Sequence, residues 1–314
     1  MSLSKARLGR MHDVMAGYVE RGEVPGIVTL VSWRGEVHVD AIGTKAVAGG
    51  DPMDHCVDAG PARSTYRVRR SFMPSHTIVS REVWREARTA HLAKEKEFTR
   101  LRDQLSVERR ALPWVKVDKT YVFEGPAGKT TLAELFDGRG QLIVYHFMFG
   151  PGWEEGCPNC SFLADHIDGA VTHLAHRDVT LLAVSRAPLR QIEAFKKRMG
   201  WRFTWVSSHG TDFNVDYHVS FTKEQTAKGA VDYNFAPREF PSEEAPGISV
   251  FCKDEHGEVF HTYSAYARGL DMLLGAYNYL DLAPKGRDED ALAFTMAWVR
   301  HHDRYGDGTG RSQG

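Results

Sequence analysis

The run QLIVYHFMF, residues 141–149, constrains the fold more than any other stretch of the chain. It is almost continuously apolar, as expected for a strand that is buried on both faces of a sheet. A segment of helical character follows from about Cys157 to His176, and a second apolar run, VTLLAVS, occupies residues 179–185. A strand, a helix and a strand in this order predict two parallel strands joined by a helical crossover.

The rest of the C-terminal part continues this alternation. A helix bounded by Pro188 and Gly200 precedes a strand at 203–208, and the runs GISVFCKD and EVFHTYSAY then predict a hairpin before a last helix. That last helix is expected from about Gly269 to Leu282. The order βαβαβ, then a β-hairpin, then α predicts an α/β fold with a mixed sheet flanked by helices.

A long charged segment precedes the predicted sheet. Ser80 is a suitable N-cap and Pro113 a suitable stop for a helix between them. Its apolar residues share one face and are Trp84, Ala87, Phe98, Leu101 and Leu105. Charges of both signs alternate on the remaining surface, as in KEKEFTRLRDQLSVERR. We therefore expect an amphipathic helix that packs on its own domain rather than a coiled coil or a nucleic-acid surface.

The first fifty residues have a separate pattern. Apolar residues at helical spacing, Leu8, Met11, Met15 and Tyr18, precede the strand-like runs IVTLVSW and EVHVDAIG, which are separated by Arg34-Gly35. This helix and hairpin resemble the entry segment of the serine β-lactamase and esterase family. The nucleophile motif Ser-x-x-Lys of that family is absent from residues 51–72, and the SFTK string at Ser220 has no companion motif.

We therefore expect residues 1–53 to be a truncated β-lactamase-like fragment without hydrolase activity. Residues 54–72 are the predicted linker, and residues 73–314 the predicted main domain. One helix and one hairpin bury too little apolar surface to be stable as a complete domain.

The overall composition excludes several classes of protein. The formal net charge is -1, from 40 basic and 41 acidic side chains, so no electrostatic footprint for nucleic acid or an anionic membrane is present. The N-terminus lacks the apolar region of a secretory signal, and no run approaches the roughly 20 apolar residues of a membrane helix. The four cysteines do not form a secreted disulfide scaffold. We expect a cytoplasmic protein, in which a close cysteine pair indicates catalysis or metal binding.

Cys157 and Cys160, separated by Pro158 and Asn159, form that pair. They lie just after the central strand, where the next helix begins, and the unpaired N–H groups of a helix start stabilise a thiolate. Cys160, one turn later, is close enough to displace a substrate from a mixed disulfide at Cys157. Glu154 and Glu155 oppose the thiolate through their negative charge, so we expect only moderate activation of Cys157.

Two other classes of function remain open from these residues. A metal-binding module would need two further ligands, for which His146 and His166 are candidates, although His146 lies within an apolar strand where a hydrogen-bonded core histidine is more common. Cys252 could serve as a third thiol or only as a small buried side chain, and Cys56 is most simply an incidental thiol. A non-catalytic interaction protein is the last alternative.

The segments LPWVKVDKTYVFEGPAGKTTLAELFDGR, QLIVYHFMFGPGWEEGCPNCSF and WVRHHDRY, with those between them, resemble the thioredoxin-like family catalogued as domain of unknown function 899. The resemblance runs from about Met73 to Tyr305. It implies a thioredoxin-like fold of the peroxiredoxin-type branch and a dithiol–disulfide oxidoreductase. The partners expected from it are a protein or small-molecule disulfide substrate and a thiol reductant, and we expect no cofactor or metal. The composition predicts no nucleic-acid or membrane partner.

The resemblance to the thioredoxin superfamily also assigns a role to Ala245-Pro246, immediately before a strand. In that superfamily a cis-proline at this position faces the cysteine pair, which implies a catalytic role for Pro246. Two departures qualify the resemblance: Pro158-Asn159 stands where Gly-Pro is usual, and Trp153 lies four residues upstream of Cys157 rather than beside it. Glu154 replaces the threonine of peroxiredoxins, which argues against an efficient thiol peroxidase.

Overall fold

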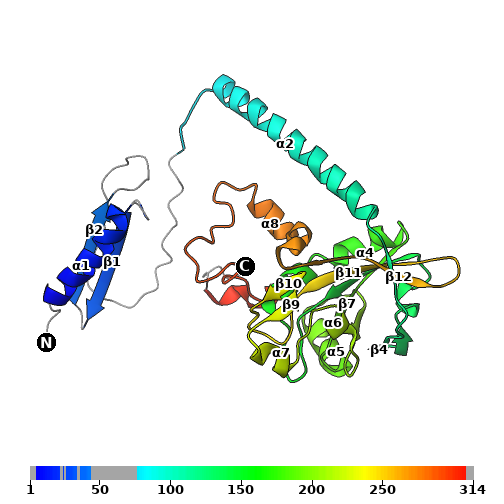
Figure 1. The fold of residues 1–314 in the computed structure, drawn as a ribbon. Coiled ribbons are helices and arrows are strands. Elements are labelled where there is room, and N and C mark those ends of the chain that lie inside the picture. Colours follow the sequence, from blue (N-terminus) through cyan, green and yellow to red (C-terminus); the bar gives the residue numbers. More distant parts are fainter. Residues whose placement is uncertain (1–4, 22–23, 25, 34–35, 44–75, 309–314) are drawn as a thin grey trace. The chain divides into compact units, whose positions relative to one another are not determined.

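The structure is a computed structural model that describes residues 5–21, 24, 26–33, 36–43 and 76–308 (Figure 1). The chain divides into two compact units, Met1–Ser71 and Phe72–Gly314. No helix among the described residues combines the length and the apolar composition needed to cross a membrane.

The first unit contains the predicted helix and hairpin. Helix α1 (Lys5–Glu20) precedes strands β1 (Gly26–Trp33) and β2 (Glu36–Gly43), which pair antiparallel. The His12 ring and the Asp40 carboxylate join the helix to the hairpin, with Nδ1 and Oδ2 2.7 Å apart. Residues 44–75, which include Cys56 and the segment without the nucleophile motif, lie outside the described part of the chain.

The second unit is built on an eight-stranded mixed sheet, with helices on its faces (Figure 1). The strand order is β3-β12-β11-β6-β7-β8-β4-β5; β6, β7 and β8 run parallel, and the other neighbours pair antiparallel. The predicted α/β class, a mixed sheet flanked by helices, is confirmed. The strands are β3 (Val115–Lys116), β4 (Val122–Gly125), β5 (Gly128–Thr131), β6 (Gln141–His146), β7 (Val179–Ser185), β8 (Trp205–Ser207), β11 (Gly247–Lys253) and β12 (Val259–Tyr266).

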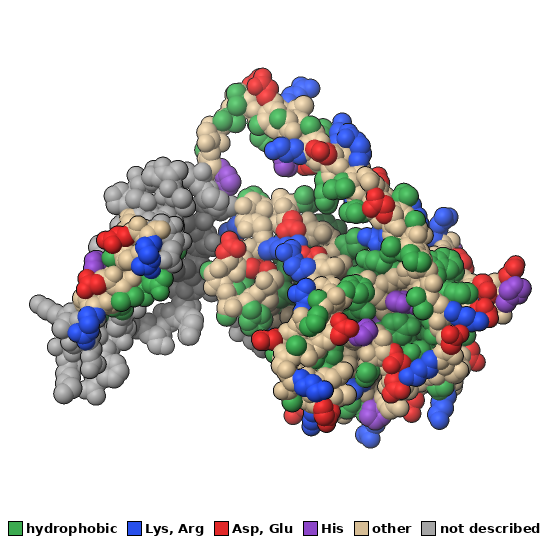
Figure 2. Space-filling model, in the orientation of Figure 1, with side chains coloured by type: hydrophobic (Ala, Val, Ile, Leu, Met, Phe, Trp, Pro, Cys, Tyr) green, Lys and Arg blue, Asp and Glu red, His purple; other side chains and the backbone are tan. Residues whose placement is uncertain are grey.

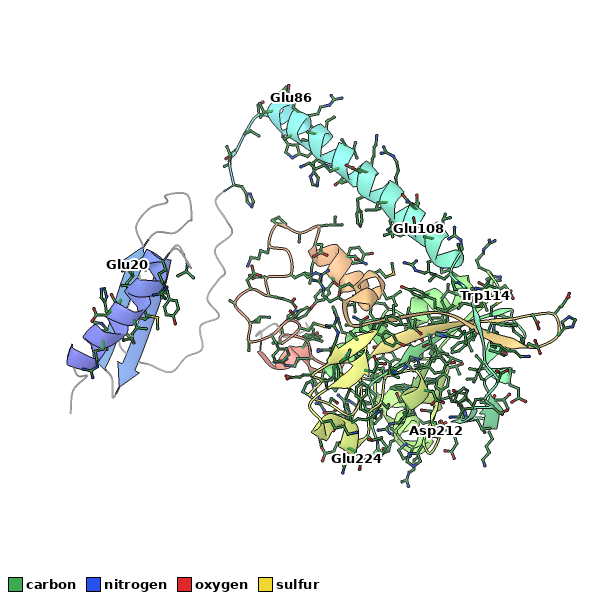
Figure 3. The ribbon with its side chains drawn as sticks, viewed as in Figure 1. Glu20, Glu86, Glu108, Trp114, Asp212 and Glu224 are labelled. Carbon is green, nitrogen blue, oxygen red and sulfur yellow. The ribbon has the colours of Figure 1, made fainter. Side chains whose placement is uncertain are left out.

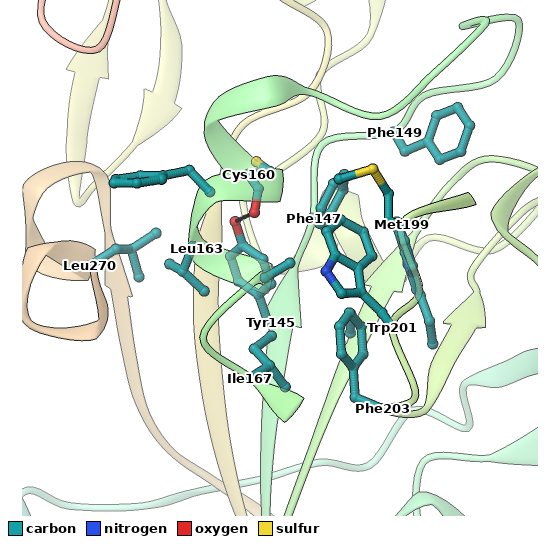
Figure 4. Close-up of a cluster of buried hydrophobic side chains, with 14 of the residues drawn as sticks. Tyr145, Phe147, Phe149, Cys160, Leu163, Ile167, Met199, Trp201, Phe203 and Leu270 are labelled. Carbon is teal, nitrogen blue, oxygen red and sulfur yellow. Dashed lines mark hydrogen bonds between the residues drawn. The ribbon is translucent and has the colours of Figure 1, made fainter. Parts of the chain in front are cut away.

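Strand β6 is central because both of its faces are apolar. Successive strand side chains point to opposite faces, so Leu142 and Val144 enter one hydrophobic core while Tyr145 enters the other. Phe147 and Phe149, which follow the strand, extend the second core toward Trp201 and Met199 (Figure 4). Burial on both sides explains why the sequence of this strand shows no polar alternation.

The helices after β6 are shorter than the sequence predicts. The expected helix from Cys157 to His176 is two helices, α3 (Pro158–Ala164) and α4 (Asp168–Ala175). The expected last helix is a 3-10 segment, η2 (Ala267–Leu273), followed by α8 (Gly275–Leu280). Tertiary hydrogen bonds stabilise the break between α3 and α4. The Asp168 carboxylate, at the start of α4, accepts from the backbone N–H groups of Arg202 and Phe203. The helical segments are η1 (Glu134–Phe136), α3 (Pro158–Ala164), α4 (Asp168–Ala175), α5 (Leu189–Arg198), α6 (Phe213–Asp216), α7 (Lys223–Ala227), η2 (Ala267–Leu273), α8 (Gly275–Leu280) and η3 (His302–Gly308).

A small hairpin, β9 (Val231–Tyr233) with β10 (Ala236–Arg238), lies in the region between β8 and β11. Ser220 of the SFTK string lies in the same region. It is buried, and its hydroxyl donates to Glu244, 2.7 Å away. Lys223 is exposed at the start of α7. The serine therefore takes part in a buried polar contact rather than in a solvent-accessible nucleophile site.

Apart from its last turn, where the Arg109 guanidinium lies 4.9 Å from the centre of the Tyr263 ring, the long helix α2 (Arg81–Arg110) does not pack on the domain. This part of the prediction is wrong. None of its residues is buried, and Trp84 and Phe98 are 57% and 65% exposed. Figure 2 shows its apolar side chains at the surface among charged ones, and Figure 3 labels Glu86 and Glu108 near its two ends. Ion pairs and hydrogen bonds within the helix, such as Arg88–Glu95, support it locally instead of packing.

Candidate active site

The two cysteines occupy different environments at the start of α3. Cys157 is the N-cap residue and is half-buried, whereas Cys160 is only 2% exposed. Between them, Pro158 is exposed and takes the first helical position, where its missing N–H costs nothing, and Asn159 is half-buried. A backbone hydrogen bond from Cys157 N–H to Met148 O, 3.0 Å, ties the helix start to the chain that leaves β6.

The Cys157 sulfur is a moderately activated thiol. A hydrogen bond from the Cys160 thiol lowers the pKa of Cys157, burial opposes it, and the backbone N–H groups of Cys160 and Asn159 lower it further, to about 7. At a pH of about 7, half of the Cys157 side chains are therefore thiolates. This pKa corresponds to the moderate activation expected from the sequence. The expected backbone N–H groups contribute to it, but the hydrogen bond from the Cys160 thiol is the largest effect that lowers the pKa.

The Cys160 thiol stays protonated. Burial, followed by the proximity of Cys157, raises the pKa of Cys160 well above its usual range. Its sulfur accepts a weak hydrogen bond from Met148 N–H, 3.5 Å away. The Tyr145 hydroxyl donates to the Cys160 carbonyl oxygen at 3.4 Å, as the dashed line in Figure 4 shows. The pair thus combines an ionisable outer thiol with a buried inner one.

A surface pocket of about 290 Å³ opens at Cys157. Two segments far apart in the sequence form its walls: the approach to α3 and the C-terminal segment around His301. Its lining residues are Trp153, Glu155, Gly156, Cys157, Pro158, Arg300, His301 and Arg304. Of these, the sequence had singled out Trp153, Glu155, Cys157 and Pro158. It had not singled out Arg300, His301 and Arg304, whose only signal was that WVRHHDRY belongs to the segments resembling the family.

Glu155 does not oppose the thiolate as the sequence predicts, because two arginines neutralise it. The Arg304 guanidinium donates to both of its carboxylate oxygens, at 2.8 and 2.9 Å, and Arg198 donates to one of them. Although burial raises the pKa of Glu155, the hydrogen bonds from Arg198 and Arg304 outweigh it and hold that pKa below its usual range. Glu154, the other acidic residue, is exposed to solvent.

His301 fixes the backbone next to the reactive cysteine. It is 2% exposed, and its Nε2 lies 2.9 Å from the carbonyl oxygen of Gly156. A carbonyl oxygen only accepts, so Nε2 carries the proton, and Nδ1 accepts from the Arg198 guanidinium at 3.3 Å. Gly156 itself is enclosed: an added Cβ would lie 2.6 Å from Phe147 and 2.9 Å from Phe195. The hydrogen bond from His301 and the close packing against the two aromatic rings therefore position Gly156, the residue that precedes Cys157.

The peptide bond before Pro246 is not the cis bond that the sequence predicts. No peptide bond in the described part of the chain is cis, so Ala245-Pro246 is trans, which is the intrinsically favoured isomer. The carbonyl oxygen of Pro246 accepts from the Tyr233 hydroxyl at 2.8 Å, and burial, together with the proximity of Cys160, raises the pKa of Tyr233. Ala245 is buried in a separate small core. The Tyr233 hydroxyl also accepts from the Ala267 N–H at 3.0 Å, so it joins Pro246 to the start of the segment that follows β12.

Strand register separates Cys252 from the pair and makes the third-thiol alternative wrong. Gly247 pairs with His146 at the end of β6 that leads to α3, whereas Cys252 pairs with Gln141 at the other end. Five residues of strand span about 16 Å. The Cys252 sulfur is therefore remote from Cys157.

The candidate histidine ligands take part in other contacts. His146 is fully buried, its Nε2 lies 2.9 Å from the Ser249 hydroxyl, and burial, with a smaller effect of His261, lowers its pKa to about 3. His166 Nε2 accepts from the Ala276 N–H at 3.0 Å. Among the described residues no three His, Cys, Asp or Glu side chains are grouped to hold a metal ion.

Comparisons with solved structures find peroxiredoxins with low similarity. Peroxidoxin BcpB from Mycobacterium tuberculosis is 13% identical with a TM-score of 0.35, and covers 52% of this chain and 94% of its own. A cysteine-to-serine mutant of peroxiredoxin Q from Xanthomonas campestris is 13% identical with a TM-score of 0.35, over 54% and 98% of the two chains. The mitochondrial 2-Cys peroxiredoxin from Plasmodium falciparum is 13% identical with a TM-score of 0.33, over 54% and 94%.

No curated protein matches the chain. The resemblance of residues 1–53 to the β-lactamase entry segment has no support in the comparisons, because the family match begins only at residue 73. That match extends to residue 305 and covers about three quarters of the chain, including both cysteines and the pocket. The chain therefore belongs to the family described as bacterial proteins of unknown function, DUF899.

Proposed function

We propose that this protein is a thiol–disulfide oxidoreductase that uses Cys157 as the nucleophile and Cys160 as the resolving thiol. One observation carries the proposal: the outer sulfur borders a pocket and has a pKa near 7, while the inner sulfur is buried and protonated. A nucleophile works best when its pKa is close to the ambient pH, since it is then both ionised and reactive. A pair with one ionisable outer thiol and one protonated inner thiol can exchange disulfides without a metal or an organic cofactor.

The proposed reaction balances in two steps. The Cys157 thiolate attacks one sulfur of a disulfide, forms a mixed disulfide and releases the first thiolate, which takes a proton from water. The Cys160 thiol then loses its proton and attacks the Cys157 sulfur, which releases the second thiol and leaves a Cys157–Cys160 disulfide. The substrate gains two electrons and the protein loses two. A thiol reductant must return the pair to the dithiol, and the same steps run in the opposite direction when the partner is a dithiol.

Trapping experiments test the assignment of the two sulfurs. Cys160→Ser should accumulate mixed disulfides through Cys157, because the second step is removed while the first is kept. Cys157→Ser should trap almost nothing and lose disulfide reductase activity, because the remaining thiol is buried and protonated. The measurement is non-reducing electrophoresis with mass spectrometry after a disulfide is added, together with steady-state reduction of bis(2-hydroxyethyl) disulfide by the wild type and by both variants.

Cys252→Ser is the matched control, since that thiol lies at the far end of β11 and should leave both results unchanged. Equal trapping by Cys157→Ser and Cys160→Ser would contradict the assigned roles. If the wild-type pair does not cycle between dithiol and disulfide across thiol redox buffers, the oxidoreductase proposal is wrong.

A further inference from the structure

The side chains around the pocket beside Cys157 carry more positive charge than the neighbouring carboxylates neutralise. Arg304 forms ion pairs with Glu155, and Arg198, which does not line the pocket, forms ion pairs with Glu155 and Asp303. Arg300 lines the same pocket, is exposed, and has no carboxylate within ion-pair distance among the described residues. Among the residues that the structure describes, Arg300 therefore brings to the pocket of Cys157 a positive charge without an ion-pair partner.

The Arg300 guanidinium is fixed in place but has donors to spare. Its Nη1 group donates to the backbone carbonyl oxygens of Ala297 and Val299, at 2.9 and 2.8 Å. A guanidinium has five N–H donors, and those on Nε and Nη2 meet no acceptor in the described part of the chain. An ordered guanidinium with an open edge is suited to a planar anion, and a carboxylate matches two of its N–H groups at once.

The rest of the pocket limits the size and character of its ligand. A volume of about 290 Å³ is just below the usual range for small-molecule sites and suits one half of a small disulfide rather than a folded protein surface. The half-buried indole of Trp153 supplies an apolar wall. The Glu155 carboxylate presents no net negative charge to a ligand, because two guanidinium groups hold it.

We propose that this pocket selects low-molecular-weight disulfides whose halves carry carboxylate groups, with Arg300 as the residue that binds the carboxylate. The proposal rests on the proposed function, because it names the substrate class of the same dithiol. Cys157 attacks the disulfide sulfur that Arg300 positions, the half bearing the bound carboxylate stays in the mixed disulfide, and the other half leaves as a thiol. Cys160 then releases the bound half, so one carboxylate disulfide becomes two carboxylate thiols.

The test compares three disulfides of different charge on the reduced full-length protein. The probes are oxidised glutathione, which is anionic, bis(2-hydroxyethyl) disulfide, which is neutral, and cystamine, which is cationic. Second-order rate constants for oxidation of the Cys157–Cys160 dithiol come from acid quenching, alkylation and mass spectrometry. In the wild type the ratio of the anionic to the neutral rate constant should decrease as salt is raised, because screening weakens the attraction.

Arg300→Gln should lower that ratio about tenfold, the scale of one charge-assisted contact, and should remove most of its salt dependence. Arg300→Lys should retain the salt dependence with part of the ratio, since it keeps the charge and loses the planar fork. Arg268→Gln is the matched control. It removes the same charge from a side chain that is 87% exposed and does not line the pocket, so the ratio should stay unchanged.

The outcomes separate this proposal from the function on which it rests. If the neutral disulfide oxidises the pair while Arg300→Gln leaves the anionic to neutral ratio unchanged, the oxidoreductase stands and the carboxylate site is wrong. An equal loss of the ratio in Arg300→Gln and Arg268→Gln would show that net charge, and not the pocket, determines the rate. If no probe oxidises the wild-type pair, both proposals are wrong.

Discussion

Two chemically identical side chains differ in ionisation because of where each lies in one turn of helix. Cys157 is the N-cap residue, and the thiol of Cys160, with the backbone N–H groups of Cys160 and Asn159, stabilises its anion and lowers its pKa. Cys160 points into the core, where burial disfavours its anion. The hydrogen bond between the two sulfurs is the largest of the effects that lower the pKa of Cys157. The inner thiol therefore activates the outer one before it resolves any disulfide.

Replacing the Cys160 thiol, which donates to the Cys157 sulfur, should change the pH dependence of Cys157 alkylation. Cys160→Ala removes the thiol donor, so the pKa of Cys157 should rise from about 7 toward the ordinary cysteine value, about 8.5. Because only the thiolate is alkylated, the rate at pH 7 should fall about tenfold, and the midpoint of the rate against pH should move upward. Iodoacetamide alkylation followed by mass spectrometry between pH 5 and pH 10, on the scale of the ordinary thiol pKa, provides the measurement.

Cys160→Ser is the control for this prediction, since a hydroxyl keeps a donor at the same place and the midpoint should stay near that of the wild type. If Cys157 in the Cys160→Ala variant also titrates near pH 7, the backbone N–H groups alone account for the activation. The contribution assigned to the Cys160 thiol is then wrong.

The sequence identified Cys157 and Cys160 but not the arginines and the histidine beside them, for a physical reason. The Cys-x-x-Cys spacing is local, so its geometry follows as soon as a helix is expected to begin there. His301 reaches Gly156 across 145 residues, and that contact depends on the path of the whole C-terminal segment. The neutralisation of Glu155 was missed for the same reason, because Arg198 and Arg304 are remote in sequence.

At the scale of elements, the connection between β6 and α3 positions the site. Gly156, just before the N-cap, is packed against two aromatic rings, and its carbonyl oxygen is bound by His301. An added methyl group has no room there, because an approach of 2.6 Å to Phe147 is closer than any carbon contact permits. The start of α3 is therefore determined by the core behind it as well as by its own residues.

Gly156→Ala should destabilise the protein by about 1–3 kcal/mol, the usual cost of overpacking a core. It should also weaken the reactivity of Cys157, since the helix start must shift to admit the methyl group. The measurements are the free energy of unfolding in urea, by circular dichroism, and the alkylation rate of Cys157.

Gly169→Ala in α4 is the matched control, because its added Cβ meets nothing within 4 Å. It should be neutral or stabilising by up to about 1 kcal/mol, since alanine favours helix more than glycine. Equal losses of stability in the two variants would mean that the aromatic contacts at Gly156 do not determine the cost.

Strands were easier to predict than helices in this chain. The apolar runs at 141–149 and 179–185 correspond to β6 and β7, because burial on both faces leaves a continuous signal in the sequence. The division into α3 and α4 depends on Asp168, which binds backbone groups from a distant loop. The exposure of α2 could not be predicted either, since an apolar stripe shows that a face is suited to burial and not what buries it.

At the scale of the whole molecule, the chain divides into two compact units, Met1–Ser71 and Phe72–Gly314. The residues of the dithiol and of its pocket belong to the second unit. The predicted domain limits of 1–53, 54–72 and 73–314 stay a prediction, and removal of the first part of the chain tests them.

Deleting residues 1–72 should change the free energy of unfolding of the rest by no more than about 0.5 kcal/mol, the range of changes away from a core. Urea unfolding of the truncated and full-length proteins, followed by tryptophan fluorescence, measures this. The disulfide reductase rate of the truncated protein is the companion measurement and should be unchanged. A loss of several kcal/mol, or an insoluble product, would show that residues 1–72 are part of the folded core.

The joining of Gly156 to His301 has a consequence for the order in which the protein is made. The two residues are 145 positions apart, and a ribosome adds about 5–20 residues per second, so the cysteines precede the C-terminal wall of their pocket by roughly 7 to 30 s. During that interval the nascent chain carries both thiols without Arg300, His301 or Arg304 beside them. Any charge selectivity of the dithiol is therefore acquired only after Arg300, His301 and Arg304 have been made and have reached the cysteines.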